Sequence, residues 1–438
     1  MVFKRSFAIA FSAALVAIAA GCSGSGSTTT GTEPAKKDAT PTPAVEAKPE
    51  PITLKLALNK AVMTDDELKQ YIIDPVAKKY PYITIQIIDT AEKGKTLTDL
   101  VASKDIPDIY GNFPLNLNEL SDLKLTYNIE ELIKKYKFDT TRIMPELADS
   151  VKVGVNLDYL VGLPIFNQAF ALFYNKDLFD RFGQAYPKDG MTWEQARDIA
   201  VKITRVDSGV QYYGMWPDTV YRGAYQISLP WGDFKNNKPV FQTDDWKNLF
   251  TLWYDLIKIP GHGPKGTNYT KEFNEGRLGM LAGSTSTLKT MPSVQNLNWE
   301  VVTYPQNTKA PGVGQRVDSF ILTIPSQAKY KDDAFKVIDV VLSDEVQTLM
   351  SKNVRLSVLK DTKIQGEFGK NITAFQNKNV AAYTKLKFAP LKTFNNTPAA
   401  TIVIQAFESM LYDNKDVNTA LREADEKMTQ EIQKQLNR

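Results

Sequence analysis

The chain has 438 residues, a formal net charge of +3, and 43% hydrophobic and 24% charged residues, which is ordinary for a globular protein of about two domains. So small a net charge gives no electrostatic reason to expect a nucleic-acid partner. The one cysteine, Cys22, and the one histidine, His262, exclude an intramolecular disulfide, a CxxC metal site and a centre with several histidines. We therefore expect neither a metal nor a cofactor.

Residues 1–21 have the composition of a lipoprotein signal peptide. A basic start is followed by an apolar run over residues 7–20, which is shorter than the about 20 residues that span a bilayer. The sequence AAGC at residues 19–22 resembles the cleavage site of bacterial lipoproteins, with alanine in place of the usual leucine or valine at position 19. We expect lipid on Cys22 to anchor the protein to the cell membrane, facing the extracellular or periplasmic side. A plain secretory signal is the alternative.

Residues 22–51 predict a flexible tether. They are rich in Ser, Gly, Thr, Pro, Ala and Lys and show no apolar periodicity, so they cannot form a core. A flexible chain of this length spans roughly 30 Å root-mean-square. It would keep the folded part near the membrane but free to turn.

The first folded region begins as a strand, a helix and a second strand. Apolar residues alternate over residues 53–58 and again over 83–87. Between them, Thr64 and Glu67 form a capping-box pattern that opens a helix. Strand, helix and strand in this order predict a parallel sheet.

A third predicted strand, residues 105–110, leads out of this sheet at Gly111. In open parallel sheets, ligands bind beyond the carboxyl ends of the strands. Tyr110 and Asn112 are therefore candidate ligand-binding residues. A solvated turn is the alternative.

Residues 159–175 combine a broken crossing with a core strand. A glycine and a proline interrupt the backbone, and Asn167 and Gln168 then place two amides in succession. Residues 169–174 are apolar, which predicts a buried strand. Asn167 and Gln168 are candidate binding residues, and an ordinary loop into an ordinary strand is the alternative.

The order of the motifs around this strand is more informative than any one of them. The strand ends in YNKDLF at residues 174–179, and Pro187 and the sequence TWEQA at residues 192–196 follow, in which Thr192 and Gln195 form another capping-box pattern. This succession resembles the bacterial extracellular solute-binding proteins of family 1, the maltose-binding-protein-like lipoproteins of sugar ABC transporters. The resemblance covers most of residues 52–438.

The resemblance implies an α/β fold of two lobes, each with a central, mostly parallel sheet flanked by helices, joined by a multi-segment hinge. The hinge segments would bend while each lobe moves as a rigid body and closes on a ligand. The implied first lobe is residues 52–160 with 318–365, the implied second lobe is residues 165–315 with 368–438, and the implied crossings lie near residues 158–168, 312–318 and 362–370.

The resemblance also implies a function. The chain would be the membrane-anchored, substrate-binding component of an ABC importer, a monomer without enzymatic activity that captures a mono- or oligosaccharide between its lobes. Its partners would be that carbohydrate and the permease subunits of the importer. Two alternatives stay open: the same fold could bind a polyol, a peptide or a glycerophosphodiester, or the chain could be a surface glycosidase, because 50 acidic residues always allow some carboxylate pair.

The tryptophans divide into two groups by context. Trp216 and Trp231 lie in irregular stretches flanked by glycine and proline, where stacking on a sugar ring is one reason to place so large an apolar group. The aromatic platforms of the family come from this part of the second lobe, whereas packing back onto the core is the alternative. The remaining four are expected in the core: Trp193, Trp246, Trp253 and Trp299.

The other candidates are polar side chains at predicted lobe edges. Ser284 and Ser286 follow a predicted strand whose end lies at the ligand in the family. Arg316 and Asp318 follow a broken passage, and a mutual ion pair or a solvated surface is their alternative. Gln168 stands where many relatives carry an acidic sugar-binding residue, so no relative's sugar preference transfers to this chain.

Catalysis has little support in the sequence. His262 lies in the loop sequence PGHGP, and no G-x-S-x-G motif accompanies it, so we expect a polar surface residue. No G-x-x-x-x-G-K loop is present for binding ATP phosphates. No catalytic or metal-ligating residue is predicted.

Overall fold

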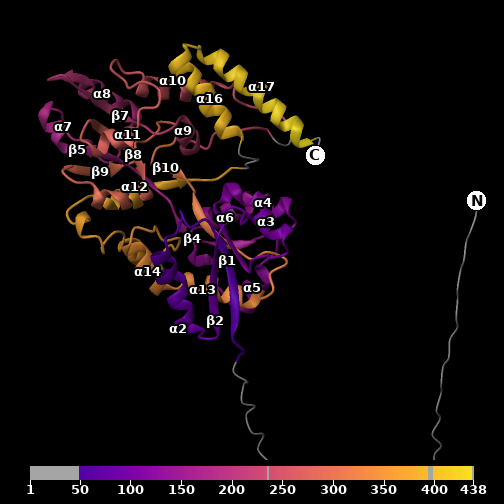
Figure 1. Cartoon of the computed structure of the whole chain (residues 1–438). Coiled ribbons are helices and arrows are strands. Elements are labelled where there is room, and N and C mark those ends of the chain that lie inside the picture. The colour runs from indigo at the N-terminus through magenta and orange to yellow at the C-terminus, as the bar shows by residue number, and fades with distance from the viewer. Residues whose placement is uncertain (1–48, 234–235, 393–397, 437–438) are drawn as a thin grey trace, which may run out of the picture. The chain divides into compact units, whose positions relative to one another are not determined.

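The computed structural model describes residues 49–233, 236–392 and 398–436 (Figure 1). The predicted signal peptide, the predicted lipidation site Cys22 and nearly all of the predicted tether lie outside these ranges. Within them, the strands form two main sheets, and the chain passes between the sheets several times. We call each sheet, with the helices that share its core, the first lobe and the second lobe.

The first sheet consists of β1 (Ile52–Leu58), β2 (Ile83–Asp89), β3 (Ile109–Asn112), β4 (Gly162–Asn167) and β11 (Ser319–Thr323). Its strand order is β2–β1–β3–β11–β4. The strand β1 pairs in parallel with β2 and β3, as the predicted strand–helix–strand unit requires. Its alternating leucines, Leu54, Leu56 and Leu58, are fully buried.

Helices of the first lobe precede, separate and follow these strands. The short helix α1 continues through a π-helical turn, η1, into α2, whose Pro75 lies in the first turn. The elements are α1 (Asp65–Leu68), η1 (Lys69–Ile73), α2 (Asp74–Lys79), α3 (Leu97–Ala102), η2 (Pro114–Asn116), α4 (Asn118–Asp122), α5 (Glu130–Lys135), η3 (Thr140–Arg142), α6 (Pro145–Val155), α13 (Lys331–Val341), α14 (Asp344–Lys352) and α15 (Thr362–Gln365).

The second sheet consists of β5 (Phe170–Asn175), β6 (Arg205–Asp207), β7 (Val210–Trp216), β8 (Leu278–Ser284) and β9 (Trp299–Thr303). Its strand order is β6–β7–β8–β5–β9, and β7 with β8 forms its parallel pair. The predicted core tryptophans are confirmed: Trp193, Trp246, Trp253 and Trp299 are all buried.

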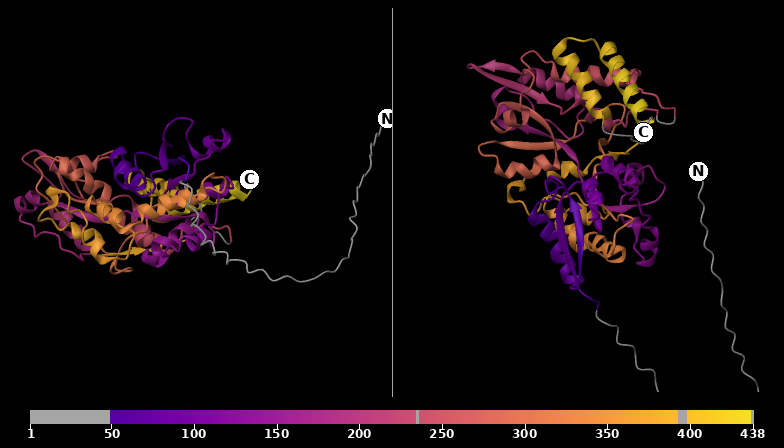
Figure 2. Two further views of the ribbon diagram at one scale, coloured as in Figure 1. Left: turned by 90° about the horizontal axis from the view of Figure 1, so that it is seen from below. Right: turned by 45° about the vertical axis from the view of Figure 1, so that its right-hand side comes forward.

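Helices of the second lobe come from two distant parts of the chain. The C-terminal α16 and α17 (yellow in Figures 1 and 2) lie side by side and pack with α10 from the middle of the chain. The elements are α7 (Lys176–Arg181), α8 (Trp193–Ile203), α9 (Val220–Gln226), α10 (Asp244–Ile257), α11 (Tyr269–Asn274), α12 (Thr285–Thr290), η4 (Met291–Ser293), η5 (Thr373–Phe375), η6 (Val380–Thr384), α16 (Pro398–Asp413) and α17 (Val417–Leu436).

The two strands that enter a sheet from the other lobe, β5 and β11, are antiparallel to the strands with which they pair. The strand β5 enters the second sheet directly from β4, and β11 enters the first sheet directly after β10 (Val313–Arg316), which pairs with β12 (Lys387–Ala389) in a small separate sheet. A strand that enters from the other sheet begins at the end of the sheet where the parallel strands finish. It must therefore run antiparallel to them. Pairing is therefore less parallel than predicted, although each lobe remains an α/β sheet flanked by helices.

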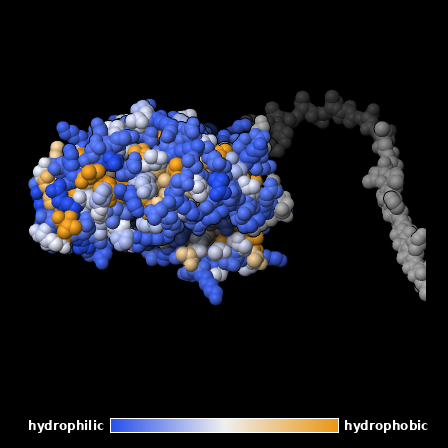
Figure 3. All heavy atoms as spheres, turned by 90° about the horizontal axis from the view of Figure 1, so that it is seen from above, coloured by the Kyte–Doolittle hydropathy of each residue, from blue (hydrophilic) through white to orange (hydrophobic). Residues whose placement is uncertain are grey.

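Predicted helix starts are confirmed where their chemistry is explicit. Thr64 and Glu67 form the capping box of α1, and Thr192 and Gln195 form that of α8. Within the described ranges, no helix combines the length and the apolar character that crossing a bilayer requires. Figure 3 shows one face that is mainly hydrophilic, with apolar side chains in small, separate patches.

Candidate functional site

The predicted site residues of the first lobe lie at one edge of its sheet. Asn112 ends β3 opposite Ile321, and Asn167 ends β4 opposite Ser319 at the start of β11. Tyr110 is 3% exposed, and its hydroxyl donates to Glu119 at 2.9 Å while accepting from the Asn112 amide at 2.6 Å. Tyr110 thus supports Asn112 from inside the lobe, and direct ligand contact by either residue stays a prediction.

The Asn167 side chain ties two crossings together. Its Oδ1 accepts from the Asp318 backbone N–H at 3.0 Å, and its Nδ2 donates to the Gln168 carbonyl at 3.0 Å. The Gln168 backbone N–H donates to the Asp318 carbonyl at 3.2 Å. The Asn167 amide is therefore used inside the protein, which gives this residue a structural role, and the half-buried Gln168 is the freer of the two candidates.

The matching edge of the second sheet carries the next group of predicted residues. The start of β5, Phe170, lies opposite Ser284 at the end of β8, and the last residue of β7, Trp216, pairs with Leu281 of β8. Ser284 caps α12 by accepting from the Ser286 backbone N–H at 3.2 Å. The Trp216 ring stacks on Tyr269 at 4.5 Å between centroids, so one of its two faces is already covered.

Two arginines lie beside this edge, the buried Arg316 and the partly buried Arg222. The Arg316 guanidinium lies 3.7 Å from the centroid of the Tyr225 ring, and its Nη2 is 3.8 Å from an Asp318 carboxylate oxygen. The Arg222 guanidinium, on α9, lies 4.5 Å from the Phe170 ring centroid. The predicted Arg316–Asp318 ion pair is thus present, but it is buried rather than solvated.

The carboxylate partner of Arg222 is held by the turn that leads into α9. Asp218 has a left-handed backbone with a φ of 68°, and one of its carboxylate oxygens lies 3.4 Å from Arg222 Nε. Burial by itself would lower the pKa of Arg222. Tyr221, Asp218 and Asp318 raise this pKa, and the net effect is a raised pKa. The guanidinium therefore stays charged inside the protein.

These residues form what we call the arginine cluster: Asp218, Thr219, Arg222, Tyr225, Tyr304, Gln315, Arg316 and Asp318. Among the described residues, the buried side-chain nitrogen and oxygen atoms without a hydrogen-bond partner are, apart from Ser351 Oγ, all in this cluster. They are Thr219 Oγ1, Arg222 Nε, Tyr304 Oη, Gln315 Oε1, and Nε and Nη1 of Arg316.

Such a concentration of unpaired polar atoms needs an explanation, because each one costs about 1–3 kcal/mol when it is buried. Tyr304 and Gln315 interact closely enough for Gln315 to lower the pKa of the phenol, which burial raises, so a small rotation could pair them. Arg222 Nε lies 3.4 Å from an Asp218 carboxylate oxygen, so a small movement could pair it as well, but Nε and Nη1 of Arg316 have no hydrogen-bond partner. They are donors prepared for a ligand that carries acceptors.

Trp231 lies beside this cluster but mainly in the core. It is 4% exposed, and its ring packs edge-on against Phe241 and Trp246. One side of it lines a small cavity together with Tyr225 and Arg316. Contact with a sugar at that side stays a prediction, whereas the packing explains the residue without a ligand.

The expectation that His262 is a polar surface residue is wrong. The ring is half-buried, stacks with Tyr269 at 5.4 Å, and lies 2.7 Å from the Tyr269 hydroxyl through Nδ1. Burial and the neighbouring Lys258 lower the pKa of His262 to about 4. Its flanking glycines and prolines suggested exposure, but they form a loop that folds back onto α11.

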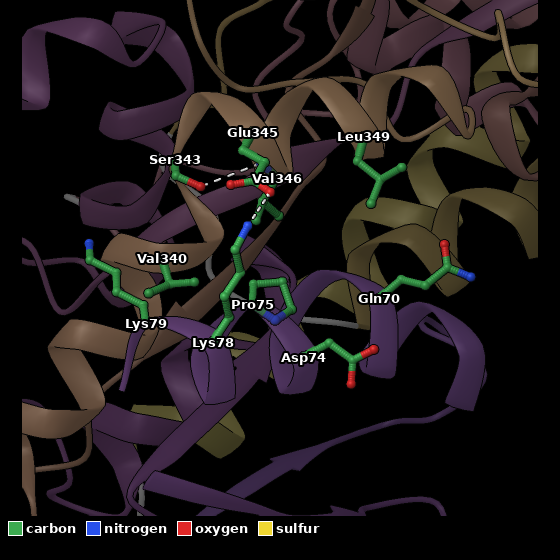
Figure 4. Close-up of a pocket in the computed structure, with 10 residues that line it drawn as sticks. All are labelled: Gln70, Asp74, Pro75, Lys78, Lys79, Val340, Ser343, Glu345, Val346 and Leu349. Atoms are coloured by element: carbon green, nitrogen blue, oxygen red, sulfur yellow. Dashed lines mark hydrogen bonds and ion pairs between the residues drawn. The ribbon is translucent and has the colours of Figure 1, made fainter. Parts of the chain in front are cut away.

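A cavity of about 660 Å³ lies elsewhere, between α2 and α14 of the first lobe (Figure 4). Its rim carries the exposed Lys78–Glu345 ion pair at 3.0 Å. It contains none of the predicted site residues and none of the unpaired buried atoms found within the described part of the chain. The described residues also include no group of three or more metal-ligating side chains.

Comparisons with known proteins agree with this architecture. The model of the family described as bacterial extracellular solute-binding protein matches residues 71–365. The mannitol-binding protein of Pseudomonas aeruginosa is 26% identical over 211 residues, which cover 44% of this chain and 47% of that relative. The chain spans about half the length of the curated relatives it matches.

Solved structures are similar over more of the chain. A substrate-binding protein of Listeria monocytogenes in complex with cycloalternan has a TM-score of 0.70 at 17% identity, covering 87% of this chain and 99% of that one. A Mycobacterium tuberculosis protein in complex with glycerophosphocholine has a TM-score of 0.70 at 15% identity, covering 88% and 99%. The predicted fold class is thereby confirmed.

Proposed function

The chain belongs to the bacterial extracellular solute-binding proteins, the components of ABC importers that bind a solute without transforming it, and on this premise we propose that its solute is a neutral carbohydrate, a mono- or oligosaccharide. The predicted family is thus confirmed. The solute, the anchor and the partner subunits are the parts that we propose.

The arginine cluster is the observation that carries this proposal. Each hydroxyl of a sugar donates one hydrogen bond and accepts others. The unpaired N–H groups of Arg222 and Arg316 offer donors, and the carboxylates of Asp218 and Asp318 offer acceptors. Such convergent polar groups beside aromatic rings suit a polyhydroxylated ligand.

The charge balance of the cluster favours a neutral solute over an anion. Two guanidinium groups face two carboxylates, so the formal charges cancel. A phosphodiester would have to approach both carboxylates in a buried site, where like-charge repulsion is strong. This argues against the glycerophosphodiester alternative, although one structural neighbour holds glycerophosphocholine. Mannitol and cycloalternan, named for two other similar proteins, are neutral and rich in hydroxyls.

Binding at this cluster requires movement. The cavity beside Tyr225, Trp231 and Arg316 measures about 20 Å³, enough for about one water and not for a sugar ring. We propose that bending at the three crossings opens this edge and then closes it on the sugar. In the closed form, Asn112, Gln168 and Ser286 would complete the site, with the uncovered face of Trp216 beside them.

The membrane attachment is also proposed. Lipid on Cys22, followed by the tether over residues 22–51, would hold both lobes near the permease subunits of an importer. Growth of the cells with labelled palmitate tests this directly. We expect label in the wild-type protein and none in Cys22→Ala.

The solute proposal is tested by calorimetric titration of the protein against a panel of neutral mono- and oligosaccharides, mannitol and glycerophosphocholine. The variant Arg316→Met should lower the affinity for the sugar that binds at least tenfold, about 1.4 kcal/mol, because it removes buried donors to the ligand. Arg181→Met is the matched control, since Arg181 forms a partly exposed ion pair with Asp207 in the same lobe. It should leave affinity unchanged.

Three outcomes would contradict the proposal. Recovery of a cleaved sugar would identify a glycosidase. Binding of glycerophosphocholine alone would replace the carbohydrate by a phosphodiester. Equal affinities of wild type and a folded Arg316→Met would remove the arginine cluster from the site.

A further inference from the structure

A second charged cluster joins the two lobes and is separate from the arginine cluster. Glu67 accepts hydrogen bonds from Arg355 through both carboxylate oxygens, from Nε at 2.8 Å and from Nη2 at 2.7 Å. The same carboxylate forms an ion pair with Lys289. Glu67 is 7% and Arg355 8% exposed, so these two charges meet in a largely dry environment, which Lys289 enters from a more exposed position.

The three residues come from different parts of the fold. Glu67 lies on α1, whose Leu68 packs in the core of the first lobe. Lys289 lies on α12, whose Leu288 packs in a core of the second lobe. Arg355 lies in a connecting segment, between Val354 and Leu356, which pack with the second lobe, and shortly before Val358, which packs with the first. The Lys289–Glu67 contact therefore spans the lobes directly.

This contact lies on the side where the lobes would separate. The helix α1 follows the carboxyl end of β1, and α12 follows the carboxyl end of β8. These are the same sheet edges that carry Asn112 and Ser284. A movement that parts these edges must also part Lys289 from Glu67.

The cluster can lose Lys289 without leaving an unpaired buried charge. The two-point contact with Arg355 neutralises Glu67 by itself, and the Arg355 guanidinium also lies 4.4 Å from the Phe166 ring centroid. The Lys289 side chain is 30% exposed, against 10% for the other two, so it regains water easily. Breaking this contact is therefore far cheaper than breaking the Glu67–Arg355 pair, whose separation would strand a charge.

We propose that Lys289 is a latch residue, whose ion pair with Glu67 holds the lobes closed and so sets the fraction of ligand-free protein in the closed form. The link to affinity rests on the proposed function: apparent affinity scales with the fraction of protein in the binding-competent form. The latch itself is a property of the ligand-free chain and can be measured without any sugar.

The test measures the distance between the lobes by electron paramagnetic resonance on spin-labelled, ligand-free protein. Lys134 on α5 and Lys202 on α8, both exposed, are replaced by cysteine for labelling, and Cys22 is replaced by serine. In this background we expect Lys289→Met to increase the long-distance population at least threefold. Lys289→Arg should restore the original distribution, because it keeps the positive charge.

The control is Lys265→Met, which breaks an ion pair between Lys265 and Glu408 within the second lobe. It should leave the distribution unchanged. If Lys289→Met lowers the melting temperature markedly, Lys289→Gln replaces it. If folded Lys289→Met and Lys289→Gln give the same distribution as the parent, or one shifted toward shorter distances, the proposal is wrong. If no sugar binds, the proposed function is refuted. The distance measurement still tests the latch, because it uses ligand-free protein.

Discussion

The Glu67 side chain both caps a helix and forms ion pairs with residues far away in the sequence. Its carboxylate accepts from the Thr64 backbone N–H at 3.1 Å, which completes the capping box of α1, while the same oxygens hold Arg355 and Lys289. The capping role is local and follows from residue spacing. The ion-pair role joins residues more than 200 positions apart, so nothing in the local pattern indicates it.

The stability of the protein should depend on pH through Glu67. Burial alone would raise the pKa of Glu67, but hydrogen bonds from Arg355 and Lys289 and their charges lower it from about 4.5 to about 2. The folded protein thus binds this proton less readily than the unfolded chain does. The stabilisation is complete above about pH 5 and is lost as the pH falls from 4.5 toward 2, by at most about 3 kcal/mol.

Urea denaturation of wild type and Glu67→Gln between pH 2 and pH 6 measures this contribution. Glutamine has no carboxyl group to titrate, so the free energy of unfolding of the variant should fall less steeply over this window. Parallel curves for the two proteins would show that the Glu67 carboxylate does not couple stability to pH.

At the level of secondary-structure elements, β4 and β11 are packed so closely that only glycine fits at one position. A Cβ atom at Gly162 would lie 2.1 Å from the Leu322 carbonyl oxygen, which belongs to the backbone and cannot rotate away. The pairing of β4 with β11 also positions Asn167 beside Asp318. A side chain at position 162 would therefore disturb the segment that crosses between the lobes.

Gly162→Ala should lower the free energy of unfolding by about 1–3 kcal/mol, because the added methyl group forces the two strands apart. Gly366→Ala is the control, because Gly366 is exposed in a right-handed helical conformation and its added Cβ would lie 3.2 Å from the Thr362 carbonyl oxygen. Thermal denaturation compares the two. Equal melting temperatures would mean that the strands yield at Gly162 without cost.

Local chemistry explains which elements could be predicted from the sequence. The capping boxes at Thr64 and Thr192 and the apolar alternation of β1 are short-range patterns, and the structure confirms them. The helix α16 is hard to predict because it is apolar on average, and only a few polar side chains, such as Thr401 and Gln405, mark its exposed face. The predicted lobe boundaries remain predictions, although β4 and β11 do pass between the sheets near the expected residues.

The candidate site was predicted only in part, for a geometric reason. The sequence predicts Arg316 and Asp318 at a lobe edge, but no local pattern indicates Asp218 and Gln315 as site residues. They become relevant only because β7, α9 and β10 converge, and Gln315 donates to the Arg222 carbonyl across 93 positions. Contact of Trp231 with a sugar stays a prediction, because the aromatic side chains around its ring explain its position without a ligand.

On the scale of the whole molecule, the two lobes are coupled because each crossing belongs to the packing of both. A sugar that contacts both lobes should therefore stabilise them together. At a free concentration one hundred times its Kd, the sugar identified in the titration panel should raise the free energy of unfolding by about 2.7 kcal/mol.

Differential scanning calorimetry measures this effect. We expect the main transition to move upward as one unit with added sugar, and Arg316→Met to show a smaller shift at the same concentration. If only part of the transition moved, the sugar would contact one lobe alone, which would argue against closure around it.

The position of β11 has a consequence for the order of folding. It lies between β3 and β4, so the first sheet stays divided until residues 319–323 have been synthesised, well after the whole of the second sheet. Neither lobe can therefore finish folding from adjacent segments alone: the first lobe requires β11, and the second requires the C-terminal helices α16 and α17. Contacts so distant along the chain slow folding and lengthen the time that apolar strand surfaces remain exposed. A fragment of residues 49–160 should accordingly remain unfolded by itself.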